Sequence, residues 1–461
     1  MTLGISGPLR FAPAGFLAAS LGVGVVVGVN PAAGVGLAVA LVFVLVVTWD
    51  LAAGVCGFLF VTFVDVLSRD NDVTLTKAAG ALLVGAWVAA MATRGTSSRD
   101  LLAAQPLLAM LVAAFLTWSA VSAVWAENGA AVVTSTVRFT LNALLFPIVL
   151  LAVRHERHVV WILSVFVAGV LLSVAWGITH DPAAGAAAAE QVGRLSGARA
   201  EANVLATMLA VGVLFAATLS IVLRRRTPPL ALLAAGAAGV GLIAFFATYS
   251  RGGLVALGFM ILVGVFYGGR WRPVMIVLAV IAVAVGAVYL GSSSSPAVER
   301  LTSGGTSGRS DIWTVAWRMV EANPVKGVGS GNFTTAEAHY LLEPGTIERD
   351  DLILDEPFVA HNIYLHVLAE LGIVGLVLFL GALAVTLGCA VRAVALFRRR
   401  DERVPELLGR ALVAGIAAIL AAGFFASEQY NKQLWLLLAM CPALLAIARD
   451  MENARHGDRT A

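Results

Sequence analysis

Long uncharged apolar runs, separated by short polar interruptions, occupy almost the whole chain. Runs of about 20 apolar residues can cross a bilayer as helices, whereas the alternating segments of about ten residues that build membrane barrels are missing. The pattern therefore predicts an all-α fold, a polytopic membrane helical bundle of about 12–14 transmembrane helices. The predicted helices are 12–29, 32–48, 50–66, 75–93, 103–125, 130–153, 158–179, 201–223, 229–248, 252–268, 273–291, 361–396, 407–427 and 431–448.

The composition agrees with a membrane protein. Of the 461 residues, 59% are hydrophobic and 13% are charged, and the mean hydropathy is +0.89, so a soluble enzyme is excluded. The formal net charge is only +3, and the basic residues are scattered, which argues against a nucleic-acid partner. The three cysteines, Cys56, Cys389 and Cys441, fall inside apolar runs, so we expect neither disulfides nor a thiolate metal site.

Arginines fall in alternate gaps between the predicted helices. Because short cytoplasmic loops carry the excess of Arg and Lys, this alternation predicts that both termini are cytoplasmic. The basic gaps hold Arg94 and Arg99; Arg154 and Arg157; Arg224, Arg225 and Arg226; Arg270 and Arg272; Arg398, Arg399, Arg400 and Arg403; and, in the tail, Arg449, Arg455 and Arg459. We thus expect an N-terminal transmembrane bundle over 1–291, one long extracytoplasmic loop carrying short helices over 292–360, and C-terminal transmembrane helices with a cytoplasmic tail over 361–461.

The 292–360 segment is the only polar segment large enough to fold over the bundle. It is expected to contain one clear helix, from Ser310 to Asn323, where Pro324 ends it. Four apolar residues share one face of this helix: Ile312, Ala316, Met319 and Val320. The helix is therefore expected to lie on the membrane surface or to cap the outer mouth of the bundle.

The charge of this segment is mainly acidic. It holds ten acidic and five basic residues, so any anion site near it must be local and cationic. Its acidic cluster, Asp350-Asp351 with Asp355-Glu356, offers oxygen ligands for Mg²⁺ or Ca²⁺. A solvated acidic loop is the preferred interpretation, because the glycine-turn spacing of a known metal loop is missing.

Arg251 and Arg309 are the first candidates for binding an anion. Arg251 follows an apolar run and precedes Gly252-Gly253, which places a guanidinium at the outer mouth of two helices, beside backbone that can approach a ligand closely. Arg309 follows the glycine-rich stretch 304–308 at a helix N-terminus, where N–H groups and the helix dipole favour an anion. The alternatives are a snorkelling interfacial arginine and an ordinary Gly-Ser loop.

Two further arginines, Arg194 and Arg199, lie in the outer loop 180–200, just before the span that begins Glu201-Ala202-Asn203. Basic residues on this side run against the charge bias, so both are candidates for the same anion. The alternative is a solvated loop in which Arg199 pairs with Glu201.

His361 stands where the long loop returns to the membrane, followed by Asn362. An imidazole titrates near neutrality and can take a proton from a hydroxyl, so His361 is the candidate general base. Glu370 lies about two turns further along the same predicted helix. The alternative for His361 is a structural role in capping the helix, and His366 is expected to be a packing or interfacial residue.

Taken in order along the chain, these residues resemble the O-antigen ligase and O-antigen polymerase superfamily. The resemblance rests on Arg194-Leu195-Ser196-Gly197, Ser250-Arg251-Gly252-Gly253, Gly308-Arg309 with Trp313, Pro324-Val325-Lys326-Gly327-Val328-Gly329-Ser330-Gly331-Asn332-Phe333, and His361-Asn362-Ile363-Tyr364-Leu365 with Glu370-Leu371-Gly372. It covers roughly residues 190–390. The segment 198–203 departs from the family pattern, which leaves open what Asn203 does and whether Arg199 replaces or assists Arg194.

The resemblance implies a GT-C type glycosyltransferase that works, without metal or other cofactor, on the extracytoplasmic face of a bacterial inner (plasma) membrane. Its donor would be a glycan on a polyprenyl pyrophosphate, usually undecaprenyl, and its acceptor a hydroxyl of a glycan, lipid or protein. In such enzymes arginines bind the leaving pyrophosphate and a histidine activates the acceptor for inverting attack. These roles would fall here to Arg251, Arg309 and Arg194, and to His361. The candidate supporting residues are Arg199, Asn203, Asn362 and Glu370.

The resemblance leaves several functions open. Ligases and polymerases share these motifs and differ chiefly in the acceptor; the ligase is the preferred interpretation. A flippase for a lipid-linked sugar would also bind pyrophosphate, but transporters more often contain discontinuous helices in paired halves, and the sequence shows no such symmetry. A structural membrane protein is the remaining alternative.

Overall fold

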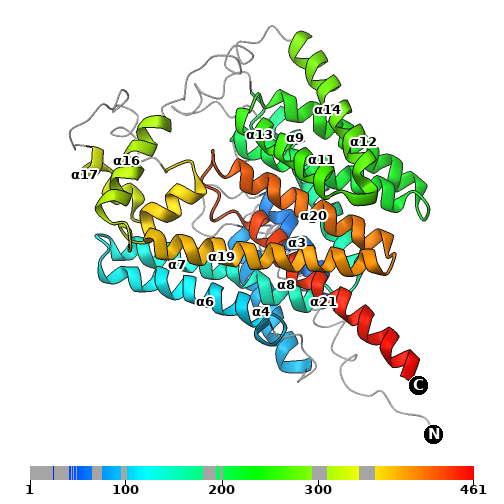
Figure 1. Ribbon diagram of the computed structural model, residues 1–461, viewed down its shortest axis with the longest axis horizontal. Helices are drawn as coiled ribbons and strands as arrows, with labels where there is room; N and C mark the ends of the chain where they lie inside the picture. Colours follow the sequence, from blue (N-terminus) through cyan, green and yellow to red (C-terminus); the bar gives the residue numbers. More distant parts are fainter. Residues whose placement is uncertain are drawn as a thin grey trace.

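A computed structural model describes residues 50–64, 75–94, 101–179, 194–197, 201–292, 309–341 and 359–460, together with single positions between 24 and 49 (Figure 1). Within these ranges the protein is helical and contains no strand. Ten of the described helices are long and apolar enough to cross a membrane, by length and composition, and two shorter apolar helices accompany them. The predicted polytopic helical membrane bundle is therefore confirmed.

Most helices follow the predicted apolar runs within a few residues, but the last one, predicted over 431–448, continues to Thr460. The predicted helices 12–29 and 32–48 lie outside the described residues apart from single positions. In the first half they are α3 (Leu51–Val64), α4 (Leu75–Arg94), α5 (Leu101–Ala104), α6 (Pro106–Val121), η3 (Ser122–Val124), α7 (Gly129–Ala143), α8 (Leu145–Ala152), α9 (Glu156–Thr179), α11 (Ala202–Leu223) and α12 (Pro228–Ala247). In the second half they are α13 (Arg251–Tyr267), η4 (Gly269–Trp271), α14 (Arg272–Ser292), α16 (Arg309–Ala322), α17 (Phe333–Leu341), α19 (Ile363–Arg399), α20 (Arg403–Ala422) and α21 (Lys432–Thr460).

Three helices, α11, α20 and α21, form the buried centre of the bundle. The sequence of α11 is apolar all the way round, as expected of a helix with no solvent face. Glycines bring its neighbours close, since a Cβ on Gly415 of α20 would lie 3.2 Å from Phe215 of α11. The centre therefore holds the ends of α11, α13 and α20 in fixed relation to one another.

The polar segment that follows α14 packs onto the end of the bundle where α19 begins (Figure 1). The predicted amphipathic helix is α16, and its apolar face, Ile312, Ala316, Met319 and Val320, is buried. This face packs in one cluster with Phe333 of α17 and with Ala360 and Ala369 at the start of α19. Of the two positions expected for this helix, the structure shows the one that caps the bundle, and the apolar face is not available to a membrane surface.

The long helix α19 is broken near its start. Gly372 has φ 64° and ψ −169°, which is not helical. The carbonyl oxygens of Ala369, Glu370 and Leu371 accept hydrogen bonds from Val328 N (3.0 Å), Gly329 N (2.8 Å) and Trp118 Nε1 (2.9 Å), and Ile373 N donates to Pro324 O (2.9 Å). Because a buried backbone group without a hydrogen-bond partner costs about 1–3 kcal/mol, these bonds make the break tolerable.

Most of these bonds come from the loop 324–332, which we call the clamp loop. A Cβ on Gly327 or on Gly372 would collide with backbone across the contact, so the loop and α19 approach without side chains between them. The far end of the loop is anchored on the α6–α7 connection: Asn332 accepts from Asn128 N (2.7 Å) and donates to Asn128 O (3.1 Å), and Ser330 N donates to Ser122 Oγ (3.0 Å). The clamp loop thus joins α16, α17, α19 and the α6–α7 connection.

We expect Gly372→Ala to destabilise the protein by about 1–3 kcal/mol or more, because alanine at this φ and ψ is strained and its Cβ would meet Val325 O. The matched control is Gly388→Ala in the same helix, where a Cβ meets nothing within 4 Å. There the change should stabilise by about 0.5–1 kcal/mol, since glycine is a poor helix former. Thermal unfolding in detergent measures both variants. Equal transition temperatures for the two would contradict the role of the break.

Candidate functional site

Arg194 is held at the point where three helix ends meet. Its Nε donates to the carbonyl oxygen of Thr248 (2.9 Å), at the end of α12, and its Nη2 donates to Asn203 Oδ1 (3.1 Å), in the first turn of α11. Ser250 Oγ donates to the same oxygen of Asn203 (2.7 Å). A guanidinium at a helix C-terminus is favoured by the helix dipole. Arg194 and Asn203 therefore fix the residues that lead into α13.

Arg251 is the first residue of α13, and its side chain is exposed. Ser250 caps this helix, since its Oγ accepts a hydrogen bond from Gly253 N (3.0 Å). A guanidinium at a helix N-terminus adds its charge to the positive end of the helix dipole, which favours a bound anion.

The two glycines after Arg251 differ in how tightly their surroundings are packed. A Cβ on Gly253 would lie 2.5 Å from Ala206 Cβ, so Gly253 is needed for the packing of α13 on α11. The sequence interpretation, that the glycine pair lets backbone approach a ligand, stays a prediction, because packing alone accounts for Gly253. A Cβ on Gly252 would only make ordinary contact with Phe425 (3.5 Å). Arg251 itself, and not the glycine pair, remains the reason to expect an anion here.

His361 precedes α19 with a left-handed backbone, φ 46°. Asn362 caps the helix, because its Oδ1 accepts from Tyr364 N (2.9 Å) and Leu365 N (3.0 Å). The capping function that sequence analysis left open for His361 thus belongs to Asn362.

The half-buried Arg309 lies at the start of α16, close enough to His361 for its charge to act on the imidazole. Trp313 of α16 donates from Nε1 to the carbonyl oxygen of Ala360 (2.9 Å), which holds the two segments together. Burial, and then the positive charges of Arg309 and His366, lowers the pKa of His361 to about 4. The imidazole is therefore neutral at physiological pH and able to accept a proton.

The connection between α20 and α21, residues 423–431, links the His361 segment to the start of α13. Ile363 N, two residues after His361, donates to Gly423 O (2.7 Å), and Phe425 lies against Gly252. Sequence analysis treated this connection only as a short gap between spans. Its polar residues Ser427, Glu428, Gln429 and Asn431 were the signal that could have marked it.

Glu370 lies deeper and supports the fold around the site. Its buried carboxylate pairs with His366 Nε2 (3.1 Å) and accepts a hydrogen bond from Phe333 N (3.2 Å). The His366 ring stacks on Phe333 with centroids 5.1 Å apart. His366 is thus a packing residue, as expected, and Glu370 ties α17 to α19.

Several predicted features lie outside the described residues: Arg199, the glycine-rich stretch 304–308 and the acidic cluster Asp350, Asp351, Asp355 and Glu356. Within the described ranges no group of three or more His, Cys, Asp and Glu side chains could hold a metal ion. The three cysteines are buried and unpaired.

These features define a multi-pass helical membrane protein with arginines and a neutral histidine at one end of the bundle. Residues 236–380 match the family described as O-antigen ligase, which confirms the resemblance to the O-antigen ligase superfamily. The matched part contains Arg251, Arg309 and His361, but neither Arg194 nor Asn203. No curated protein sequence matches the chain. The match supports a membrane protein of the O-antigen ligase or polymerase type, with glycosyltransferase-like activity.

We expect the pKa of His361 to rise in Arg309→Ala, because the variant removes one of the two charges that depress it. Diethylpyrocarbonate reacts with neutral imidazole, so mass spectrometry of labelled His361 at a series of pH values measures this pKa without any activity assay. The midpoint of labelling should move upward from about 4 but stay below about 6.5, since burial still disfavours the cation. Arg318→Ala, on the same helix but bonded to Tyr340 O, should leave the midpoint in place. An unchanged midpoint in Arg309→Ala would show that the two side chains do not interact.

Proposed function

We propose that the protein is a membrane glycosyltransferase of the O-antigen ligase type. It transfers a glycan from a polyprenyl pyrophosphate, undecaprenyl pyrophosphate in particular, to an acceptor hydroxyl on the extracytoplasmic face. The observation that carries the proposal is the closeness of Arg309 to the neutral His361, within a segment that matches O-antigen ligases. In the reaction the bond from the anomeric carbon to the phosphate oxygen breaks and a bond to the acceptor oxygen forms, with inversion.

Two arginines would bind the leaving group. A pyrophosphate leaves with its bonding electron pair, and fixed cations in a water-poor site stabilise that developing charge. Planar guanidinium groups suit it, because they donate two parallel hydrogen bonds to phosphate oxygens. Arg251 adds the N-terminus of α13, and Arg309 comes from the start of α16. With these side chains supplying positive charge, the reaction is proposed to be independent of metal.

His361 would take the proton of the acceptor hydroxyl. A depressed pKa keeps the imidazole in its basic form, and a positioned general base contributes about 10²- to 10⁴-fold in rate. Asn362 caps α19 and so fixes the backbone next to this imidazole.

Arg194 has a supporting part in the proposal. Its N–H groups donate hydrogen bonds to Thr248 O and Asn203 Oδ1, and these bonds hold the segment that leads into Arg251. The same guanidinium is proposed as a third contact for the pyrophosphate. Glu370 supports from below by joining α17 to α19.

The flippase alternative is less well supported by the fold. A discontinuous helix in a transporter leaves backbone groups open for the transported ligand. The break in α19 instead has its carbonyls occupied by the clamp loop and by Trp118.

One reconstitution tests the function directly. Purified protein in liposomes receives lipid-linked repeat units together with a separate hydroxyl-bearing acceptor, and the products are analysed by mass spectrometry. Transfer to the separate acceptor supports the ligase. Longer chains on the lipid alone would make the protein a polymerase, and movement of the donor across the bilayer without new bonds would make it a flippase.

We expect Arg251→Ala to lower the transfer rate by about 10²- to 10³-fold, the usual effect of removing one group that stabilises developing charge. Arg251→Lys should recover part of the loss, because it restores the charge without the bidentate geometry. Arg392→Ala, which removes an exposed arginine of α19, is the control and should transfer at the normal rate. Normal transfer by folded Arg251→Ala would remove the pyrophosphate role.

We expect His361→Ala to lower turnover by about 10²- to 10⁴-fold while the donor dissociation constant changes little, since the imidazole acts on the acceptor. Binding of the lipid-linked donor and single-turnover rates separate the two effects. His339→Ala is the control, because His339 is exposed and faces Glu127. A parallel loss of donor binding and turnover in His361→Ala would argue against a general base.

A further inference from the structure

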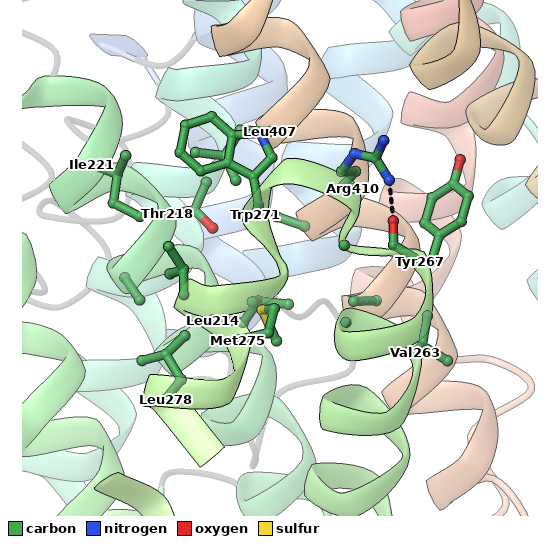
Figure 2. A pocket seen from close by; sticks show the side chains of 16 residues that line it. Leu214, Thr218, Ile221, Val263, Tyr267, Trp271, Met275, Leu278, Leu407 and Arg410 are labelled. Carbon is green, nitrogen blue, oxygen red and sulfur yellow. Dashed lines mark hydrogen bonds between the residues drawn. The ribbon is translucent and has the colours of Figure 1, made fainter. Parts of the chain in front are cut away.

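A cavity lies at the end of the bundle far from Arg251. Four helix ends enclose it: the last turns of α11 and α13 and the first turns of α14 and α20. Its volume is about 440 Å³ including its open side, and Figure 2 shows Trp271, Met275 and Leu278 on one side of it and Tyr267 and Arg410 on the other. Helix α13 separates Tyr267 from Arg251 by sixteen residues, about 24 Å at 1.5 Å per residue, so the cavity is distinct from the candidate site.

The walls of the cavity are almost entirely hydrocarbon. Leu214, Val263, Met275 and Leu278 are among the residues that line it. Ala217, Ala411 and Ala414 leave room that larger side chains would fill. Such a lining suits a flexible apolar chain and gives water few partners.

The polar groups of the cavity are confined to one end. The indole Nε1 of Trp271 is buried and has no hydrogen-bond partner within the described part of the chain. The Arg410 guanidinium, almost fully buried, donates to Tyr267 O and pairs with Glu406 (2.8 Å). Glu406 also pairs with Arg270 (2.6 Å), and Arg270 pairs with Asp401 as well, so at this end of the cavity two guanidinium groups face two carboxylates.

Exposed arginines next to the cavity supply positive charge beyond this balanced cluster. Arg272 follows Trp271 directly, and Arg224 and Arg225 follow the last turn of α11, whereas the neighbouring Arg226 pairs with Glu156 (3.9 Å). Phosphate is the anion that guanidinium groups bind best, and basic pockets between membrane helices are typical binding places for anionic lipid headgroups.

We propose that this cavity binds an anionic phospholipid, with one acyl chain between α11, α13, α14 and α20 and its phosphate among the arginines at the mouth. Phospholipids surround any membrane bundle. The apolar cavity matches the acyl chain of such a lipid, and the cationic rim matches its phosphate. The Trp271 N–H supplies a donor for an ester or phosphate oxygen at the boundary between the two. The role of such a lipid is to join helix ends that otherwise leave a void in the bundle, which costs stability.

Quenching of Trp271 tests this proposal. Bromine atoms on an acyl chain quench a tryptophan that they contact, so the protein is placed in phosphatidylcholine nanodiscs with a small fraction of brominated phosphatidylglycerol or, separately, of brominated phosphatidylcholine. The Trp271 signal is the difference between the wild-type protein and Trp271→Phe. We expect brominated phosphatidylglycerol to quench this signal several-fold more than brominated phosphatidylcholine at the same fraction, and unlabelled phosphatidylglycerol to reverse it.

Two pairs of variants sharpen the result. Val274→Phe fills the cavity and should abolish the preference, whereas Val277→Phe, on the exposed side of α14, should keep it. Arg272→Gln should make the two lipids quench equally. Equal quenching in the wild-type protein, or a preference that survives Val274→Phe, would overturn the proposal. Protection by a polyprenyl phosphate but not by unlabelled phosphatidylglycerol would also overturn it and assign the cavity to an isoprenoid chain.

Discussion

The break in α19 is the constraint on which the arrangement of the candidate site depends. A helix interrupted where its backbone is buried must find partners for its backbone groups inside the protein, and here the clamp loop and Trp118 supply them. Since Glu370 also accepts from Phe333 N, the same few residues fix α17, and through it α16, against α19. The start of α16 carries Arg309 and the start of α19 follows His361. The hydrogen bonds of the clamp loop and of Glu370 therefore hold the segments that carry Arg309 and His361 against each other.

A second connection, between α20 and α21, sets the position of the remaining arginine. Ile363 N bonds to Gly423 O, and Phe425 packs on Gly252, so the His361 segment and the first turn of α13 rest on one short piece of chain. Asn203 also helps to position the start of α13, because its amide oxygen accepts hydrogen bonds from both Arg194 and Ser250. Arg194 is thus positioned by a backbone carbonyl and by an amide oxygen.

The sequence was a good guide to helices and a weaker guide to contacts. Apolar runs located most helix ends to within a few residues, because the length of a span is a local property, although α21 continues past its predicted end at 448 to Thr460. The break at Gly372 was not predicted, since its cause is a loop 40 residues earlier in the chain, whose hydrogen bonds leave no local pattern. For the same reason the motif 324–333 pointed to the family without revealing that its glycines permit contact with α19. His361 could be chosen as a base from residue type, but its depressed pKa depends on burial and on Arg309, both tertiary.

In the proposed reaction, Arg309 acts on both substrates. While the donor is absent, its charge helps to keep the pKa of His361 low, so the imidazole is a weak base. A bound pyrophosphate would offset that charge, and the pKa of His361 would rise toward the value that burial alone allows. A stronger base takes the acceptor proton more readily, so activation of the acceptor would follow donor binding. The pH-dependent labelling of His361 reports this coupling when it is repeated with a pyrophosphate present, because a midpoint that stays in place would show that the anion does not reach Arg309. In this proposal, the single guanidinium of Arg309 makes proton removal from the acceptor follow the binding of the donor pyrophosphate.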